Sequence, residues 1–138
     1  MKLECDSVRL EFGAITVLDS VYLHLETGRI TALFGRNGSG KSCLMGVMSG
    51  CVTPQDASVR VDAQYIPARQ RFKYISHLPQ IDLVPLWLQL GAISRLMNVE
   101  FNSITSLIPQ LRSKENHLMR QLSVAERRLF EIMLVLNL

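Results

Sequence analysis

The fold is decided by eight consecutive residues, Gly35-Arg36-Asn37-Gly38-Ser39-Gly40-Lys41-Ser42. They match G-x-x-x-x-G-K-[ST], the phosphate-binding loop (P-loop) that joins a strand to a helix. Glycine permits tight turns and brings backbone N–H groups against phosphate oxygens, in conformations that a side chain would forbid. The pattern therefore predicts a nucleotide phosphate site to which all eight loop residues belong.

The residue types favour ATP with Mg²⁺ as the ligand of this loop. Lys41 can reach the β- and γ-phosphates as a mobile point charge, and the Ser42 hydroxyl can coordinate magnesium. A helix that begins here adds its positive dipole end and its unpaired N–H groups. We therefore expect ATP and Mg²⁺ as cofactors, with Ser42 as a metal ligand.

The segments on both sides of the loop support this interpretation over a chance glycine-rich turn. Ile30 to Phe34 is a short run with apolar residues on both faces, as in a central parallel strand. A helix is predicted from Lys41 to about Ser49, with Gly50 as its stop.

The rest of the first half reads as strands. Ser7 to Phe12 and Val21 to Leu25 alternate apolar and polar residues around a loop at Gly13-Ala14. Two more strands are predicted at Ser58 to Val61 and at Phe72 to Ile75.

From Pro85 onward the pattern changes to helix. Leu86, Leu90, Ile93 and Met97 recur at helical spacing, and Ser103 to Leu111 predicts a short helix broken at Pro109. A last amphipathic helix is expected to bury Leu129, Ile132, Met133 and Leu136. Strands, then a P-loop helix, then a helical part predict an α/β fold with a helical subdomain.

Three further segments carry a family resemblance. They are Leu10-Glu11-Phe12-Gly13 with Val17-Leu18, Tyr74-Ile75-Ser76-His77-Leu78-Pro79-Gln80, and Leu122-Ser123-Val124-Ala125-Glu126-Arg127-Arg128. With the P-loop, they make the chain resemble the nucleotide-binding domain of an ABC (ATP-binding cassette) ATPase. The resemblance implies a P-loop NTPase (RecA-like) core with an N-terminal antiparallel β part. It also implies a β part and P-loop core at 1–80, a helical subdomain at 81–125 and a helix returning to the core at 126–138.

In that family, an aromatic residue on the opening strand stacks on adenine, and Phe12 matches its position. A core aromatic of an alternating strand is the competing interpretation of Phe12. Tyr22 is a weaker candidate for the same stacking role.

The second segment resembles the Q-loop, which joins the core to the helical subdomain. The resemblance implies that Gln80 contacts magnesium or the attacking water, so we expect it to act in catalysis and as a metal ligand. A solvated loop glutamine is the alternative. His77 is expected to be a surface or strand-end residue.

The third segment lies where the family has its signature, usually LSGGQ or LSGGE, which reads the γ-phosphate bound by the opposite subunit. Ser123 is the expected contact. Here Val124 and Ala125 replace the two glycines, and a β-branched residue resists the conformations that glycine permits. Ser123 and Glu126 also form the pattern S-x-x-E, which predicts a capping box ahead of an apolar helix.

Hydrolysis in the family needs a Walker B strand ending in Asp-Glu and a later switch histidine. No apolar run in these 138 residues ends in Asp-Glu, and His117 precedes the signature. We therefore expect a truncated domain rather than a degenerate relative. We also expect this stretch to be inactive as an ATPase by itself.

Composition narrows the remaining classes. The chain is 48% hydrophobic and 20% charged, typical of a globular protein, and its formal charge of +3 is too small to indicate nucleic-acid binding. Its three cysteines show no CxxC spacing, so a reduced compartment is expected. The N-terminus is too acidic for a signal peptide, and Asp82, Pro85, Gln89 and Arg95 interrupt the most apolar stretch.

The first functional hypothesis is the ATP-binding subunit of an ABC transporter, coupling ATP binding and hydrolysis to transport. It implies a second nucleotide-binding domain and a transmembrane permease as partners, and a cytoplasmic place at the inner face of a membrane. The alternatives are a catalytically degenerate ATP-binding regulatory module and a soluble ABC ATPase that acts outside transport.

Overall fold

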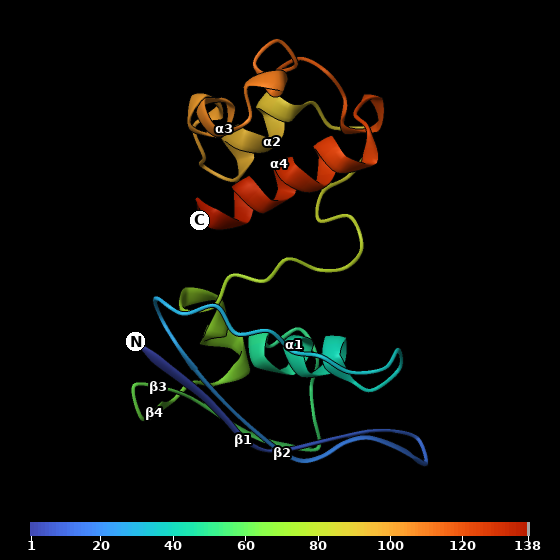
Figure 1. Cartoon of the computed structure of the whole chain (residues 1–138), viewed down its shortest axis with the longest axis vertical. Coiled ribbons are helices and arrows are strands. Elements are labelled where there is room, and N and C mark those ends of the chain that lie inside the picture. The colour runs from blue at the N-terminus through green and yellow to red at the C-terminus, as the bar shows by residue number, and fades with distance from the viewer. Residues whose placement is uncertain (138) are drawn as a thin grey trace. The chain divides into compact units, whose positions relative to one another are not determined.

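The computed structural model describes residues 1–137, arranged in two compact units, Met1–His77 and Leu78–Leu138 (Figure 1). Each unit has a hydrophobic core of its own. The division expected from the resemblance, at 1–80, 81–125 and 126–138, stays a prediction.

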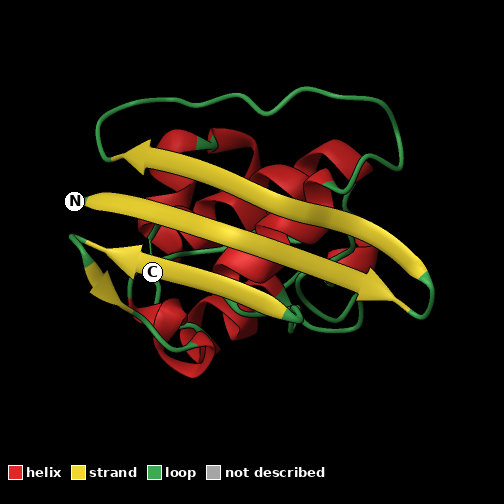
Figure 2. Ribbon diagram, turned by 90° about the horizontal axis from the view of Figure 1, so that it is seen from below, coloured by secondary structure: helices red, strands yellow, loops and turns green. Residues whose placement is uncertain are grey.

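The first unit contains an antiparallel sheet of order β2-β1-β3-β4 (Figure 2). Its strands are β1 Lys2–Phe12, β2 Ile15–Glu26, β3 Asp56–Val61 and β4 Gln64–Tyr65. In the register, Leu3 lies opposite Leu25 on β2 and opposite Val61 on β3. The strands predicted at 7–12, 21–25 and 58–61 are confirmed, and β1 and β2 extend beyond them on both sides of the Gly13-Ala14 turn.

Helix α1, Lys41–Ser49, covers one face of this sheet (Figure 1). Val8, Val47 and Val59 are fully buried in the shared core. Gly50 ends the helix as predicted, with φ 86° and its N–H donating to the Val47 carbonyl at 3.1 Å. A side chain at Gly50 would place its Cβ 2.6 Å from the Ala68 carbonyl oxygen, so only glycine fits this approach.

The strand predicted at Ile30–Phe34 is wrong. These residues have no regular secondary structure, and Ile30 and Phe34 are 102% and 88% exposed. A strand requires a neighbour that completes its hydrogen-bond ladder. Among the described residues, no strand pairs with residues 30–34, so the apolar pattern alone does not make them extended sheet.

The strand predicted at Phe72–Ile75 is also wrong, because a 3₁₀ helix, η1 Ala68–Lys73, occupies its first half and the rest forms no strand. The cause is Arg71, which is buried and donates through Nε to the Ile66 carbonyl at 3.1 Å and through Nη1 to the Val47 carbonyl. The helical turn directs Arg71 inward and leaves Phe72 71% exposed.

The second unit is helical. Its elements are α2 Leu90–Leu96, α3 Phe101–Leu107, η2 Pro109–Leu111, η3 Met119–Gln121 and α4 Val124–Leu136. The rings of Phe101 and Phe130 lie 6.4 Å apart within its core. The short helix broken at Pro109 is confirmed. Within the described part of the chain, no helix has the length and apolar character of a membrane span.

The helix predicted from Pro85 begins only at Leu90. The residues before Leu90 instead form backbone hydrogen bonds with a later segment. The carbonyls of Leu86 and Leu88 accept from the N–H groups of Arg120 and Met119. Leu90 and Ile93 are buried, as their spacing predicts.

The buried face of α4 differs from the predicted one. Leu129 and Leu136 are 41% and 72% exposed, and Ile132 is half-buried. Met133 is buried as predicted, and the core takes Phe130 and Leu134 in place of the other predicted residues. These residues follow the same i, i+3, i+4 spacing, so the pattern identified the helix but not its rotation.

The capping box at the start of α4 is confirmed. Ser123 Oγ accepts from the Glu126 N–H at 3.2 Å, and Glu126 Oε2 accepts from the Ser123 N–H at 3.0 Å. Lys114 Nζ donates to the other carboxylate oxygen. The Lys114 ammonium, followed by the Ser123 N–H, lowers the pKa of Glu126 from its ordinary value of 4.5 to about 2.

We therefore expect acid to destabilise the helical unit through Glu126. A carboxylate with a depressed folded-state pKa contributes stability above its unfolded pKa and loses it as pH falls toward the folded one. Between pH 4.5 and about pH 2, the melting temperature of the wild type should fall more steeply than that of Glu126→Gln. Thermal melts across this range check it, with Glu100→Gln, at an exposed position of the same unit, as the control. Parallel curves for the wild type and Glu126→Gln would contradict the expectation.

Candidate nucleotide-binding site

The P-loop lies where the exposed segment after β2 turns into α1. Gly40 caps the helix with φ 84°, and Gly38 has φ 81°. Both values lie in the left-handed region that favours glycine. Gly40 also rests on β2, since a Cβ there would lie 2.8 Å from Leu18 Cδ2 and 3.1 Å from the Val17 carbonyl oxygen. The sheet thus fixes the point at which α1 begins.

The side chain of Lys41 folds back onto the backbone of the loop. Its Nζ donates to the carbonyls of Gly35 at 2.8 Å and Arg36 at 2.7 Å. The Ser39 N–H donates to the same Arg36 carbonyl at 3.2 Å. The ammonium is therefore held inside the loop, where it has hydrogen-bonding capacity left for an anion, because Lys presents three donors.

The start of α1 leaves backbone donors free. The first helical hydrogen bond runs from the Leu44 N–H to the Gly40 carbonyl at 2.8 Å. Among the described residues, no acceptor is recorded for the N–H groups of residues 40–43, and no acidic residue lies in the first turn. Free N–H groups, the helix dipole and Lys41 together favour an anion at this point. The loop therefore fits a nucleotide phosphate group.

Ser42 is exposed at the first turn of α1, and its hydroxyl makes no hydrogen bond within the described residues. A hydroxyl next to bound phosphates can act as an oxygen ligand of Mg²⁺, which prefers oxygen and takes phosphate oxygens as its other ligands. The residues present thus fit the metal as well as the nucleotide.

An apolar hollow of about 170 Å³ lies beside the loop. It is lined by Leu18, Val21, Leu33, Phe34, Gly40 and Lys41, among others. Apolar walls next to polar phosphate donors are typical of nucleotide pockets.

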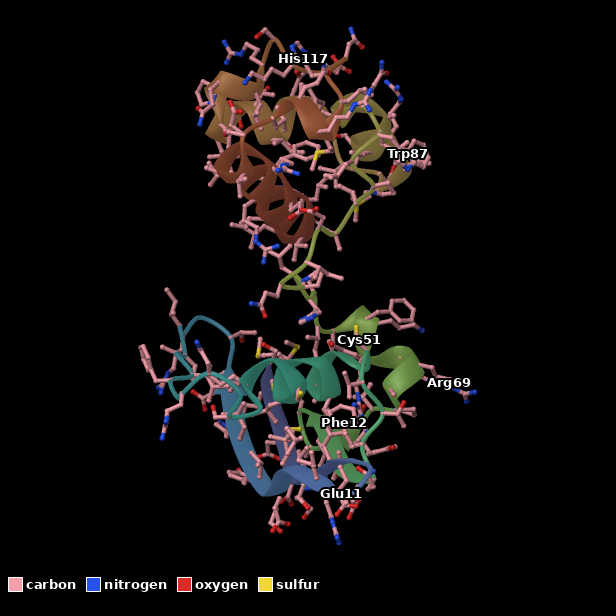
Figure 3. The ribbon with its side chains drawn as sticks, turned by 90° about the vertical axis from the view of Figure 1, so that its right-hand side faces the viewer. Glu11, Phe12, Cys51, Arg69, Trp87 and His117 are labelled. Atoms are coloured by element: carbon pink, nitrogen blue, oxygen red, sulfur yellow. The ribbon has the colours of Figure 1, made fainter. Side chains whose placement is uncertain are left out.

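Phe12 lies at the end of β1, next to the turn at Gly13, in the same unit as the P-loop (Figure 3). It is 55% exposed, whereas Val8 and Leu10 on the same strand are buried. This exposure disfavours the interpretation of Phe12 as a core aromatic. Tyr22, on β2, is also 61% exposed, so stacking on adenine stays a prediction for either residue.

Gln80 is exposed and lies in a segment without regular secondary structure, in the second unit. His77, half-buried, is the last residue of the first unit. Gln80 and the P-loop belong to different units, and the expected role of Gln80 at magnesium stays a prediction.

Ser123 and the residues after it lie at the N-terminus of α4. The Ser123 hydroxyl is engaged with Glu126, donating to Oε2 at 3.1 Å. Val124, which replaces a signature glycine, is the first helical residue and is 74% exposed. Its side chain therefore lies beside Ser123 at the helix N-terminus, and the expected contact of Ser123 with a γ-phosphate stays a prediction.

Two residues that position these elements escaped the sequence analysis. Arg71 holds the C-terminal end of α1 through the Val47 carbonyl, and Glu131 is 1% exposed on α4. Arg71 does not stand out in the sequence, because it lies in a polar stretch, whereas Glu131 interrupts an apolar helix. A charged residue flanked by apolar ones on a predicted helix was the available signal for Glu131.

Comparison with known proteins agrees with this geometry. A family profile described as "ABC transporter" matches residues 18–138. A hemin import ATP-binding protein of Photobacterium damsela subsp. piscicida is 37% identical over 81 residues, covering 56% of this chain and 31% of that protein. A putative ribose/galactose/methyl galactoside import ATP-binding protein of Rhizobium etli is 26% identical over 148 residues, covering 94% and 29%.

Solved structures share the fold. The structure titled as the ATP-binding subunit of an ABC transporter superposes with a TM-score of 0.77 at 20% identity, covering 97% of this chain and 61% of that one. A nucleotide-free ATP-binding cassette from an ABC transporter gives 0.78 at 19% identity, covering 99% and 65%. The chain spans about a third or less of the length of the hemin and the ribose/galactose/methyl galactoside import proteins named above. The residues that the family profile matches make up most of the chain and include the phosphate loop, so the chain belongs to the ABC transporter family.

Proposed function

We propose that residues 35–42 bind the phosphates of ATP with Mg²⁺, within the ATP-binding subunit of an ABC transporter. The observation that carries the proposal is the arrangement at the start of α1. The Lys41 ammonium is held in the loop by the carbonyls of Gly35 and Arg36, beside unpaired N–H groups. This arrangement presents positive charge and directed donors to a single anion.

Each group has a separate task in this proposal. The N–H groups at the helix start hold the phosphates, Lys41 neutralises their charge, and the Ser42 hydroxyl is a ligand of Mg²⁺. Phe12 stacks on the base, which gives binding without hydrogen-bond readout of the purine. Gln80 approaches the metal or the attacking water. When bound, ATP supplies the phosphoryl group whose transfer the whole protein uses.

The proposed partners follow from the family. A second nucleotide-binding domain contributes its signature, and a transmembrane permease uses the resulting closure for transport. The proposed location is the cytoplasmic face of a membrane. The relatives named above are described as importers of hemin and of sugars, which favours import over export for this chain.

A second candidate is a module that binds ATP without turning it over. The exposed Val124 and the engagement of the Ser123 hydroxyl with Glu126 favour it. Phosphate release by the full-length protein separates the two, since turnover that is lost in Lys41→Ala would support the transporter ATPase. Equal background release in both would support the non-hydrolysing module.

Lys41→Ala should weaken ATP binding at least tenfold. A hydrogen bond to a charged group contributes about 1.5–3 kcal/mol, and about 1.4 kcal/mol corresponds to a factor of ten. Calorimetric titration with Mg-ATP checks it on a folded protein that contains this sequence. Lys73→Ala, at an exposed lysine of the same unit, is the matched control. The site assignment fails if both variants bind ATP as tightly as the wild type.

Phe12→Ala should lower ATP affinity at least fivefold while leaving the melting temperature nearly unchanged. Stacking of a base on an aromatic ring contributes about 1–3 kcal/mol, and the exposed ring of Phe12 contributes little to the core. Phe72→Ala, at a similarly exposed phenylalanine, controls for general surface effects. Loss of stability with unchanged affinity would show that Phe12 is a packing residue, and a loss of affinity only in Tyr22→Ala would assign the stacking to Tyr22.

A further inference from the structure

Helix α4 carries a carboxylate in an unusual place. Glu131 is 1% exposed, and glutamate is rarely this buried unless its charge is paired. We propose that Glu131 is a positioning residue for Gln80, because it ties the segment that carries Gln80 to the helix that begins at Ser123. The inference rests on the proposed function for the role of Gln80, but the tie itself is a property of the second unit alone.

Both carboxylate oxygens of Glu131 are engaged. Oε1 accepts from the backbone N–H of Leu83 at 2.6 Å, and Oε2 accepts from Arg128 Nη1 at 3.2 Å. Hydrogen bonds to an ionised carboxylate are shorter and stronger than neutral ones. The Glu131 side chain is 2% exposed, whereas that of Arg128 is 38% exposed. The inner contact of this carboxylate is therefore the one with the backbone of Leu83.

This contact adds a hydrogen bond to a stretch that is otherwise held by apolar contacts, such as the packing of Val84 against the core of the unit. Residues 76–84 form no helix or strand. Within the described part of the chain, the bond from the Leu83 N–H is the one hydrogen bond recorded for these nine residues. Backbone hydrogen bonds resume at Pro85 and Leu86, whose carbonyls accept from the N–H groups of Leu88 at 3.2 Å and of Arg120 at 2.9 Å. Glu131 thus supplies the hydrogen bond that anchors the backbone of this segment at Leu83.

The anchor is close to both functional residues along the chain. Gln80 precedes Leu83 by three residues, which span at most about 10 Å when extended. Glu131 follows Ser123 by eight residues on one continuous helix, a rise of about 12 Å. A displacement of the N-terminus of α4 would therefore be carried through the helix and the hydrogen bond from Glu131 to Leu83 to the segment next to Gln80.

A purely structural role for Glu131 predicts a different outcome from a positioning role. Loss of core packing should loosen the whole helical unit, whereas loss of the anchor should free residues 78–86 in particular. Met133→Ala is the matched control, because Met133 is buried on the same helix and contacts neither Leu83 nor Arg128 through hydrogen bonds. Glu131→Leu removes the carboxylate acceptor and puts an apolar side chain of similar size in its place.

Hydrogen–deuterium exchange with mass spectrometry tests the inference on the folded full-length protein, with and without Mg-ATP. In Glu131→Leu, the peptide covering residues 78–86 should exchange at least tenfold faster than in the wild type, and any protection that Mg-ATP gives this peptide should be lost. In Met133→Ala, the same peptide should change no more than the other peptides of the unit. ATP affinity should stay within twofold in both variants, because the P-loop is untouched.

Two further outcomes are decisive. Equal exchange of residues 78–86 in Glu131→Leu and Met133→Ala would overturn the proposal. If Glu131→Leu fails to fold, Glu131→Asp replaces it, since its shorter side chain keeps the charge but withdraws the oxygen from Leu83, and unchanged exchange in that variant would overturn the proposal equally. Failure of the wild type to bind ATP would count against the proposed function, while the comparison of variants without nucleotide would still decide the anchor.

Discussion

The close approach of Gly40 to Val17 and Leu18 is the contact on which the site depends. It seats the end of the P-loop on β2 at a distance that leaves no room for a side chain, with φ 84° at the glycine. Helix α1 therefore begins at a point fixed by the sheet, and its first N–H groups find no partner among residues 1–137. The same helix is held at its other end by Arg71, whose guanidinium donates to the Val47 carbonyl. A cation at the C-terminus of a helix also complements its dipole.

In the second unit, the positions of a helix and a loop are also fixed by contacts to the backbone, but here the contacts come from carboxylates. Its helix α4 begins with the capping box of Ser123 and Glu126 and carries Glu131 on its buried side. Both glutamates use their carboxylates to hold backbone N–H groups, one at the start of the helix and one in the segment after Gln80. Side-chain carboxylates of α4 thus hold both the start of the helix and the loop segment at Leu83.

The sequence predicted the parts of the fold that are set locally. The P-loop helix and its stop at Gly50, the paired strands around Gly13-Ala14 and the capping box at Ser123 each depend on residues within a few positions of one another. Such patterns can be recognised in the sequence, because turn glycines and capping side chains determine the backbone conformation of residues next to them. The prediction of the phosphate loop rests on the same kind of local pattern.

The failures concern features that distant residues decide. Ile30–Phe34 has the composition of a central strand, but a strand needs a partner that its own sequence does not supply. Arg71 turned the expected strand at Phe72–Ile75 into a helical turn by binding carbonyls that precede it by five and twenty-four residues. The rotation of α4 depends on what packs against it. Glu131 was missed because its partner, Leu83, lies 48 residues away.

The central claim is that the free N–H groups at the start of α1 bind the phosphates of ATP. Amide NMR spectra of isotope-labelled protein, recorded while Mg-ATP is added, test it most directly. The account predicts the largest shifts at the amides of Gly38, Gly40, Lys41 and Ser42, saturating with the nucleotide. The absence of shifts in residues 35–42, or saturable shifts confined to other parts of the chain, would contradict it.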